Sequence, residues 1–290
     1  MPKTVVIGAN GFLGKNFLSA YQRVYPDCIG TTRYPGNQYF LDLMEPDISP
    51  LQLSKKGYQE AIILAAIPNI SICENEKDFT RKVNVDGTLS LIRQLVDEGV
   101  KPIFTSTDCV FDGITGNYED EASPNPIVEY GSQKSEVEDQ IKKTCGHEYL
   151  TIRLSKVFSL EKGDGSLLDE MASTLASGGI IRAAYDQFFC PTLASDLVNV
   201  VLKIQEKNLW GTINVCSPEK WSRYDLAIKL ANAMNNNGNI KRISLDDLGE
   251  PFKRPKNTTL LVKDLKKKID YLFTPMDLCI MKIAQNWSYK

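Results

Sequence analysis

The feature that most constrains this fold is a short apolar run that leads directly into three evenly spaced glycines. The run TVVI spans residues 4–7, and its β-branched side chains are typical of a buried strand. Gly8, Gly11 and Gly14 follow in GANGFLG. Apolar side chains then recur on one helical face, at Leu13, Phe17, Ala20, Tyr21 and Val24. A strand, a glycine turn and a helix in this order predict the start of a parallel α/β sheet.

The turn has the composition of a dinucleotide-binding fingerprint, spaced GxxGxxG rather than GxGxxG. The first glycine allows a sharp turn, the second lets the backbone approach a pyrophosphate, and the third lets the helix pack closely on the strand. The N–H groups and partial positive charge at a helix N-terminus also favour phosphate. We therefore predict that a dinucleotide cofactor contacts Gly8, Gly11, Phe12, Leu13 and Gly14.

The identity of the cofactor depends on the residues that end the second predicted strand, Cys28 to Thr32. Where the ribose 2′-hydroxyl is free, an acidic residue usually binds it about 20 residues past the glycines. Here the sequence is TTR, and Arg33 can bind a 2′-phosphate through charge-assisted hydrogen bonds. We predict NADP(H), with NAD(H) as the alternative if Arg33 is only a solvated loop residue.

Two later segments supply further predicted cofactor contacts. In FLDLMEPD, Asp42 and Leu43 would lie beside the adenine, unless Asp42 only caps the end of a strand. The run AIILAA at 61–66 is typical of a buried third strand. Its small residues Ala65 and Ala66 would leave room for the cofactor.

Strands and helices alternate over the first 160 residues or so. A helix is predicted from about Asp78 to Asp97, with Asn84 in its middle, where an asparagine is unfavourable unless it packs or bridges. Lys101 to Ser106 is predicted as a fourth strand and Tyr149 to Leu154 as a further one. Alternation at this spacing gives right-handed parallel crossovers, so we predict an α/β fold with a doubly wound parallel (Rossmann) sheet.

Three side chains that can move a proton follow the fourth strand. Thr107 stands just past its end, and Tyr130 and Lys134 lie four residues apart, on one face of a predicted helix. The ammonium, together with the positive nicotinamide ring of an oxidised cofactor, would lower the pKa of the phenol from its usual value of about 10. The tyrosine could then protonate a carbonyl oxygen as a hydride reaches carbon. Thr107 would hydrogen-bond the same oxygen, and Lys134 would also hold the nicotinamide ribose.

Composition excludes several other classes of protein. The net charge of −2 gives no case for binding nucleic acid or an acidic membrane surface. The seven cysteines are scattered without a CxxC pair and His147 is the single histidine, so we predict neither a metal site nor a Ser-His-Asp mechanism. The first residues resemble neither a signal peptide nor a membrane span, and we expect a reduced, cytoplasmic protein.

A chain of 290 residues is long enough for about two domains. We place a nucleotide-binding domain at 1–158, to which 191–216 returns through the β-like run GTINVCSP. After residue 158 the strand-helix rhythm loosens. We therefore place a smaller, interleaved domain that binds the substrate at 159–190 and 217–290.

Six motifs in order resemble one family: GANGFLG, TSTDCVFDG, YGSQK, RLSKVFS, DQFFCPTLASDL and KRPKNTTL. The chain resembles the extended short-chain dehydrogenases/reductases, and among them the dTDP-4-dehydrorhamnose reductase branch. The resemblance implies NADPH-dependent reduction of a 4-keto group on a nucleotide-linked 6-deoxy sugar. It assigns Thr107, Tyr130 and Lys134 as the catalytic triad, and it makes a homodimer the assembly to test for.

The sugar-facing positions depart from that branch. Asp108 and Cys109 follow the catalytic threonine, with Cys109 where the branch usually has tyrosine, and Lys156 replaces an aromatic residue. The segment DQFFC also stands where small polar residues are common. Basic residues that would bind the pyrophosphate of a sugar nucleotide, unless they are solvated surface charges, are Arg182, Lys253 and Arg254.

Other functions use the same residues. A 4,6-dehydratase needs an acid-base pair, commonly Asp-Glu, beside the threonine; the pair Asp108-Cys109 disfavours it but leaves a nucleotide-sugar epimerase open. The branch also resembles the non-catalytic, NADP-binding regulatory subunit of methionine adenosyltransferase. A plain NADP-binding redox sensor is the remaining alternative.

Overall fold

The computed structural model describes residues 1–36, 39–236 and 239–288, and its first strand has the bounds that the apolar run predicts. This strand, β1, is buried at all four residues and lies within a six-stranded sheet of order β10-β5-β4-β3-β1-β2. β1 pairs in parallel with β2 and β3, and β3 pairs in parallel with β4. The prediction of a doubly wound parallel α/β sheet is confirmed. The strands are β1 (Thr4–Ile7), β2 (Gly30–Thr31), β3 (Glu60–Ile63), β4 (Lys101–Thr107), β5 (Leu150–Leu154) and β10 (Gly211–Val215).

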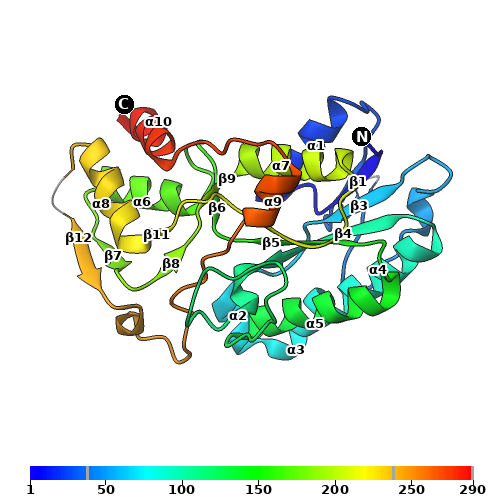
Figure 1. Cartoon of the computed structure of the whole chain (residues 1–290), viewed down its shortest axis with the longest axis horizontal. Coiled ribbons are helices and arrows are strands. Elements are labelled where there is room, and N and C mark those ends of the chain that lie inside the picture. The colour runs from blue at the N-terminus through cyan, green and yellow to red at the C-terminus, as the bar shows by residue number, and fades with distance from the viewer. Residues whose placement is uncertain (37–38, 237–238, 289–290) are drawn as a thin grey trace. The chain divides into compact units, whose positions relative to one another are not determined.

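Helices cover both faces of this sheet: α1 lies on one face, and α4 and α5 lie on the other (Figure 1). The predicted helix over 78–97 exists but is divided, because a π-helical segment, η2, interrupts it around Asn84. A helix-period pattern does not distinguish such a segment from regular α-helix. The elements are α1 (Phe12–Gln22), η1 (Ser49–Leu51), α2 (Ile70–Asn75), α3 (Lys77–Arg81), η2 (Lys82–Gly87), α4 (Thr88–Asp97), η3 (Asp108–Val110) and α5 (Glu129–Cys145).

The chain divides into two units, each assembled from separate stretches. The first comprises Met1–Val110, Pro124–Arg153 and Val201–Ile213, and the second comprises Phe111–Ser123, Leu154–Val200 and Asn214–Lys290. These bounds differ from the expected ones at three places, the first being that residues 154–158 belong to the second unit. The loop 111–123 belongs to the second unit, and only 201–213, rather than 191–216, returns to the first.

Hydrogen bonds explain why the loop 111–123 leaves the first unit. The backbone of Asn257 donates to Gly113 O at 2.9 Å, and Tyr118 N donates to Thr259 O at 2.9 Å. Leu261 N in turn donates to Tyr118 O at 2.8 Å. Two motifs far apart in the sequence, VFDG and RPKN, are therefore held together by backbone pairing within the second unit.

The second unit has its own apolar core, formed mainly where α6, α8 and α10 pack together (Figure 1). Leu168, Leu226 and Cys279, one from each helix, are fully buried there. β7 and β12 pair in parallel beside these helices. The elements are β6 (Val157–Phe158), α6 (Leu167–Ala176), β7 (Ile181–Ala184), β8 (Phe188–Phe189), β9 (Thr192–Leu193), β11 (Trp221–Ser222), α8 (Arg223–Ala233), β12 (Ile240–Ile243), η4 (Leu245–Leu248), α9 (Lys263–Lys268) and α10 (Met276–Ser288).

A buried polar cluster in the first unit is centred on Gln205, near the end of α7 (Ala194–Glu206). Its amide oxygen accepts a hydrogen bond from the hydroxyl of Tyr21 at 2.9 Å. Its amide nitrogen donates to Thr4 Oγ1 at 3.0 Å and to Glu60 Oε2 at 2.5 Å. Residues from β1, α1 and β3 thus share one partner that lies about two thirds of the way along the chain.

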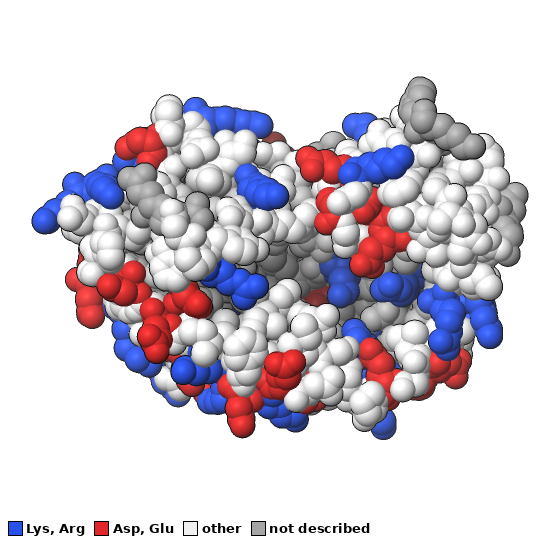
Figure 2. Space-filling model, turned by 180° about the vertical axis from the view of Figure 1, so that it is seen from behind, with Lys and Arg blue, Asp and Glu red and all other residues white. Residues whose placement is uncertain are grey.

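Acidic and basic side chains are interspersed over the face drawn in Figure 2, in keeping with the small net charge. Across the parts of the chain that the structure describes, no helix is both long and apolar enough to cross a membrane. The same parts contain no group of three or more His, Cys, Asp or Glu side chains placed to hold a metal ion.

Candidate functional site

The glycine turn after β1 is folded so tightly that two of its glycines have no room for a side chain. Gly8 has a φ of +90°, and a Cβ atom there would stand 2.8 Å from Ala65 N. A Cβ on Gly14 would stand 2.2 Å from Gly8 O. Because β2 and β3 flank β1 on opposite sides, the turn lies where the strand order reverses, which is the usual ligand position in such sheets.

A pocket of about 440 Å³ opens beside this turn, within the size range of small-molecule sites. Predicted cofactor residues that line it are Gly8, Gly11, Arg33, Asp42, Leu43, Ala65 and Ala66. Phe12, Leu13 and Gly14 do not line it: they form the first turn of α1, and Gly14 is buried against Gly8. That these three residues contact a cofactor therefore stays a prediction.

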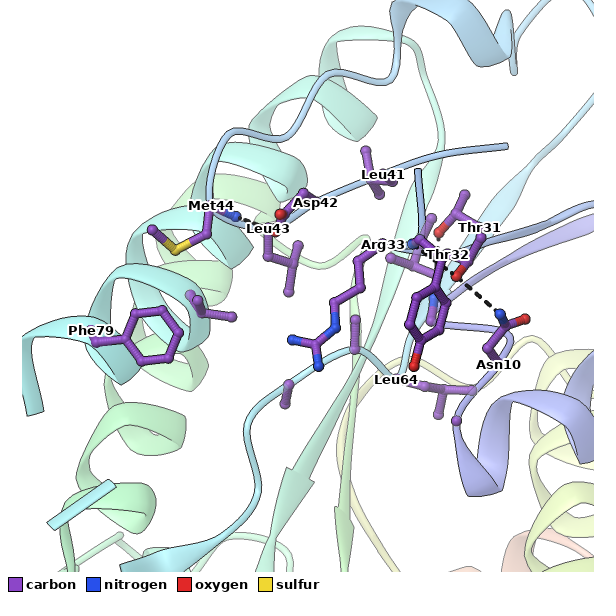
Figure 3. A pocket seen from close by; sticks show the side chains of 17 residues that line it. Asn10, Thr31, Thr32, Arg33, Leu41, Asp42, Leu43, Met44, Leu64 and Phe79 are labelled. Carbon is purple, nitrogen blue, oxygen red and sulfur yellow. Dashed lines mark hydrogen bonds between the residues drawn. The ribbon is translucent and has the colours of Figure 1, made fainter. Parts of the chain in front are cut away.

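Arg33 extends into the middle of the pocket (Figure 3). Its side chain is exposed, and among the described residues its guanidinium has no hydrogen-bond or ion-pair partner. Thr32, the residue before it, is buried and occupied: its hydroxyl oxygen accepts from Asn10 Nδ2 at 3.0 Å. Arg33 is therefore the cation of this pocket that is free to meet an anion.

Asp42 and Leu43 lie on another side of the same pocket (Figure 3). Asp42 Oδ1 accepts a hydrogen bond from Met44 N at 3.0 Å. This bond within the loop is the kind of local capping role that was the alternative to adenine binding. An adenine contact through the other oxygen stays a prediction. Among the ten lining residues that were not predicted as cofactor contacts are Asn10, Met44, Phe79 and Val83.

A signal for two of these residues exists in the sequence. Asn10 lies inside the glycine fingerprint itself, and Phe79 is an aromatic residue that interrupts the charged run EKDFTRK. Phe79 is 45% exposed although it is a large apolar side chain on a helix, which marks it as available for a ligand. Met44 and Val83 carry no comparable signal.

Asn84 has the bridging role that its unfavourable helical position predicts. It is fully buried, and its Oδ1 accepts from Ile67 N at 2.8 Å while its Nδ2 donates to Ile67 O at 3.0 Å. Nδ2 also donates to Gln133 Oε1, on α5, at 2.8 Å. One side chain thus fixes the segment that follows β3, including the pocket-lining Ala65 and Ala66, and connects it to α5.

Thr107 is the last residue of β4, and Tyr130 and Lys134 lie on α5, which packs against the same strand. The ammonium of Lys134 is buried, donates to Thr105 O at 2.8 Å and lies 5.9 Å from the centroid of the Tyr130 ring. A Cβ on Gly131 would be only 2.0 Å from Cys109 O, so the glycine after Tyr130 permits this close approach. The three predicted catalytic residues therefore belong to two elements in direct contact.

Burial shifts the pKa of both titratable members of this group. Desolvation raises the pKa of Tyr130 well above its usual value, and negative charge on Cys109, Cys73 and Asp108 adds to the rise. Desolvation also lowers the pKa of Lys134 to about 8, opposed by Glu138 and Cys73. The sequence argument predicted a lowered phenol pKa from Lys134 together with an oxidised nicotinamide; in the protein without cofactor the shift has the opposite direction, because loss of solvent dominates the phenol.

The residues directly after β4 are tied to one another. Thr107 Oγ1 donates to Asp108 Oδ1 at 3.3 Å and accepts from Cys109 N at 3.2 Å. The Cys109 thiol donates to the same Asp108 oxygen at 3.6 Å. Thr107, Asp108 and Cys109 are all buried, so the predicted substrate contacts of this segment form one small hydrogen-bonded group beside Tyr130.

The remaining predicted substrate residues, Lys156, Arg182 and Arg254, belong to the second unit. Arg182 donates to Asp247 O at 2.7 Å, and Arg254 forms an ion pair with Glu250. Lys156 and Lys253 are exposed. Both arginines thus have partners within the protein, and the substrate contacts of all these residues stay predictions.

A parallel sheet with a glycine turn and an adjoining pocket at its switch point defines a Rossmann-type α/β protein. The chain belongs to the family described as the RmlD substrate binding domain, whose model matches residues 2–285.

Two relatives and one solved structure illustrate the range of that similarity. The "probable low-salt glycan biosynthesis reductase Agl14" of Haloferax volcanii is 27% identical over 275 residues, 91% of each chain. The "methionine adenosyltransferase 2 subunit beta" of Bos taurus is 25% identical over 269 residues, 89% of this chain and 80% of the relative. The dTDP-4-dehydrorhamnose reductase of Bacillus anthracis, solved in complex with NADP, superposes with a TM-score of 0.84 at 25% identity, covering 98% of this chain and 99% of that one.

Proposed function

We propose that this protein is an NADPH-dependent reductase of a nucleotide-linked 4-keto-6-deoxy sugar. The observation that carries the proposal is the contact of β4 with α5, which groups Thr107, Tyr130 and Lys134 in the same unit as the pocket beside the glycine turn. Two of the relatives named above are reductases, one of them solved with NADP. The substrate class follows from the branch that the motifs resemble.

The pocket fits a dinucleotide phosphate on its own chemistry. Added Cβ atoms at Gly8 and Gly14 would collide with backbone, so the turn keeps the space and the N–H groups that a pyrophosphate needs. The N-cap residue of α1 is Gly11, which has no side chain to cap the helix, so the first N–H groups of α1 are left for a ligand. The unpartnered Arg33 supplies a cation suited to a 2′-phosphate and supports NADP(H) over NAD(H).

The reaction assigns each catalytic residue one task; the bound cofactor supplies the hydride. Tyr130, whose raised pKa keeps it protonated at neutral pH, donates its phenolic proton to the carbonyl oxygen as that oxygen gains negative charge. Thr107 turns its weakly held hydroxyl from Asp108 toward the same oxygen and orients it. Lys134, fixed by Thr105 O, stabilises the phenolate that remains.

NADPH oxidation with a panel of dTDP-, UDP-, GDP- and CDP-linked 4-keto-6-deoxy sugars tests the proposal directly. We expect turnover with at least one member of the panel and a faster rate with NADPH than with NADH. A folded protein that binds NADPH but oxidises it with no member of the panel would contradict the reductase assignment.

A regulatory subunit is the second candidate, and the relatives named as beta subunits of methionine adenosyltransferase support it. It predicts that NADPH raises the melting temperature, that no nucleotide of the panel does so, and that a partner protein does. The hydrogen-bonded Thr107 and the buried Lys134 favour the reductase, since a subunit without turnover has no need of this costly arrangement.

A further inference from the structure

An ion pair lies fully inside the first unit, one helical turn beyond Lys134. Arg153 on β5 and Glu138 on α5 have side chains only 1% and 0% exposed. Arg153 Nε donates to both carboxylate oxygens at 3.1 Å, and its Nη2 donates to Oε2 at 2.7 Å. The catalytic assignment made above gives this pair no task.

The pair also reaches β4 next to the reacting groups. Ser106 Oγ donates to Glu138 Oε1 at 2.5 Å, and Ser106 directly precedes Thr107. Lys134 donates to the carbonyl of Thr105, the residue before Ser106. Two side chains of α5, one turn apart, are therefore hydrogen-bonded to two consecutive residues of β4. These bonds fix the end of β4, and with it Thr107, relative to α5.

Stability alone is a poor explanation for two charges in this place. Removing both ions from water is costly, and an apolar pair of similar volume is often as stable as a buried ion pair. The Glu138 carboxylate also does more than pair with Arg153, because its Oε1 accepts a second hydrogen bond from Ser106 Oγ.

The carboxylate also bears on the charge of Lys134. The groups that act on this buried ammonium are Glu138 on its own helix and Cys73 on α2. Tyr130 lies one turn before it, while Asp108 and Cys109 act on Tyr130. Of these, Glu138 is the acidic group that offsets the desolvation of Lys134.

We propose that Glu138, oriented by Arg153, is a positioning residue for the Thr107–Tyr130–Lys134 group. Its carboxylate anchors the end of β4 to α5 and keeps Lys134 charged. The part that concerns turnover rests on the proposed reductase function; the part that concerns the charge of Lys134 does not.

The test follows the proton on Lys134 without substrate or cofactor. The free energy of unfolding is measured by urea titration between pH 6 and pH 10, for wild type and Lys134→Met, and again for both in a Glu138→Gln/Arg153→Met background. Within each pair, the difference in unfolding free energy between the protein with Lys134 and its Lys134→Met variant is plotted against pH. The slope of this plot changes, giving a bend, at the pH where folded Lys134 loses its proton. We expect the bend at about pH 8 in wild type and roughly one pH unit lower in the neutral background. An unmoved bend would overturn the proposal.

The matched control removes the exposed ion pair between Arg81 on α3 and Glu136, which lies on α5 like Glu138. Arg81→Met/Glu136→Gln should leave the bend where it is in wild type, since solvent screens exposed pairs. A bend that moves equally in the control would show a general effect of charge on α5 and count against Glu138.

Activity separates this proposal from the reductase assignment. With a working substrate, the alkaline limb of the pH–rate profile should move down together with the bend. A moved bend in a protein that reduces no sugar leaves Glu138 supported and the reductase assignment refuted. If the double variant does not fold, Ser106→Ala keeps the ion pair and removes only the anchor. It should lower kcat about tenfold with little change in melting temperature, and an unchanged kcat would overturn the anchoring role.

Discussion

Gly131 on α5 lies so close to Cys109 that a Cβ atom built on the glycine would stand 2.0 Å from the Cys109 carbonyl oxygen. The two residues adjoin Tyr130 and the Thr107–Asp108 hydrogen bond, respectively. The backbone after β4 and the first turn of α5 therefore touch without any side chain between them. This contact determines how near the phenol comes to the threonine.

Gly131→Ala tests this contact. The methyl group must push α5 and η3 apart, and we expect overpacking to cost about 1–3 kcal/mol of unfolding free energy. Turnover should fall by far more than this loss of stability explains, because Tyr130 moves away from Thr107. Urea unfolding and NADPH oxidation measure the two effects. Ser132→Ala, at the exposed neighbouring position, is the control and should change neither.

Arg33→Gln should weaken NADPH binding much more than NADH binding. The unpartnered guanidinium lines the pocket, and losing a charge-assisted hydrogen bond of about 1.5–3 kcal/mol corresponds to roughly a 10- to 100-fold higher Kd for NADPH. Calorimetric titration with both cofactors gives the two Kd values. Arg23→Gln alters an exposed arginine outside the pocket and should alter neither. Equal weakening of both cofactors would argue against a 2′-phosphate contact.

Tyr130→Phe should abolish the proton donor while leaving the cofactor pocket unchanged. The expected loss in kcat is about 10²–10⁴-fold, with the Kd for NADPH within a factor of two or three. Single-turnover kinetics and fluorescence titration measure these quantities. Retained turnover would mean that another group protonates the carbonyl oxygen.

Asn84→Ala should destabilise the first unit and loosen its pocket together. The substitution removes the partner of Ile67 N and leaves Ile67 O with only the Cys73 thiol as donor, which costs about 1–3 kcal/mol. NADPH affinity should also fall, because Ala65 and Ala66 lose the anchor of their segment. Asn232→Ala, at an exposed position on α8, provides the comparison. Normal stability of the Asn84 variant would refute the bridging role.

Local patterns in the sequence were sufficient where a residue's neighbours are near in the chain. The bounds of β1, the glycine turn and the return of GTINV to the sheet as β10 were all predictable from periodicity and glycine spacing. The unfavourable position of Asn84 correctly predicted a bridging role, although its partner Ile67 was not evident.

Long-range contacts account for what was missed. The interrupted helix over 78–97 follows from Asn84 and from Gly87, where a Cβ would stand 1.7 Å from Leu43 O, and no helical pattern records such a contact. The assignment of loop 111–123 to the second unit depends on backbone bonds to residues more than 130 positions later. The upward shift of the phenol pKa in the protein without cofactor was missed because sequence spacing gives the charge on Lys134 but not the loss of solvent around the partly buried Tyr130.

The Gln205 cluster has a consequence for biosynthesis. Thr4, Tyr21 and Glu60 leave the ribosome early, yet the amide that satisfies all three is made about 145 residues after Glu60. Until then the Tyr21 hydroxyl and the Glu60 carboxylate lack this amide as their partner, so we expect the N-terminal half to stay protease-sensitive during translation. Limited proteolysis of stalled chains that expose 190 or 215 residues tests this: only the longer should resist. Completion of the cofactor-binding unit is thus coupled to prior synthesis of residues 111–123 and 154–200 of the second unit.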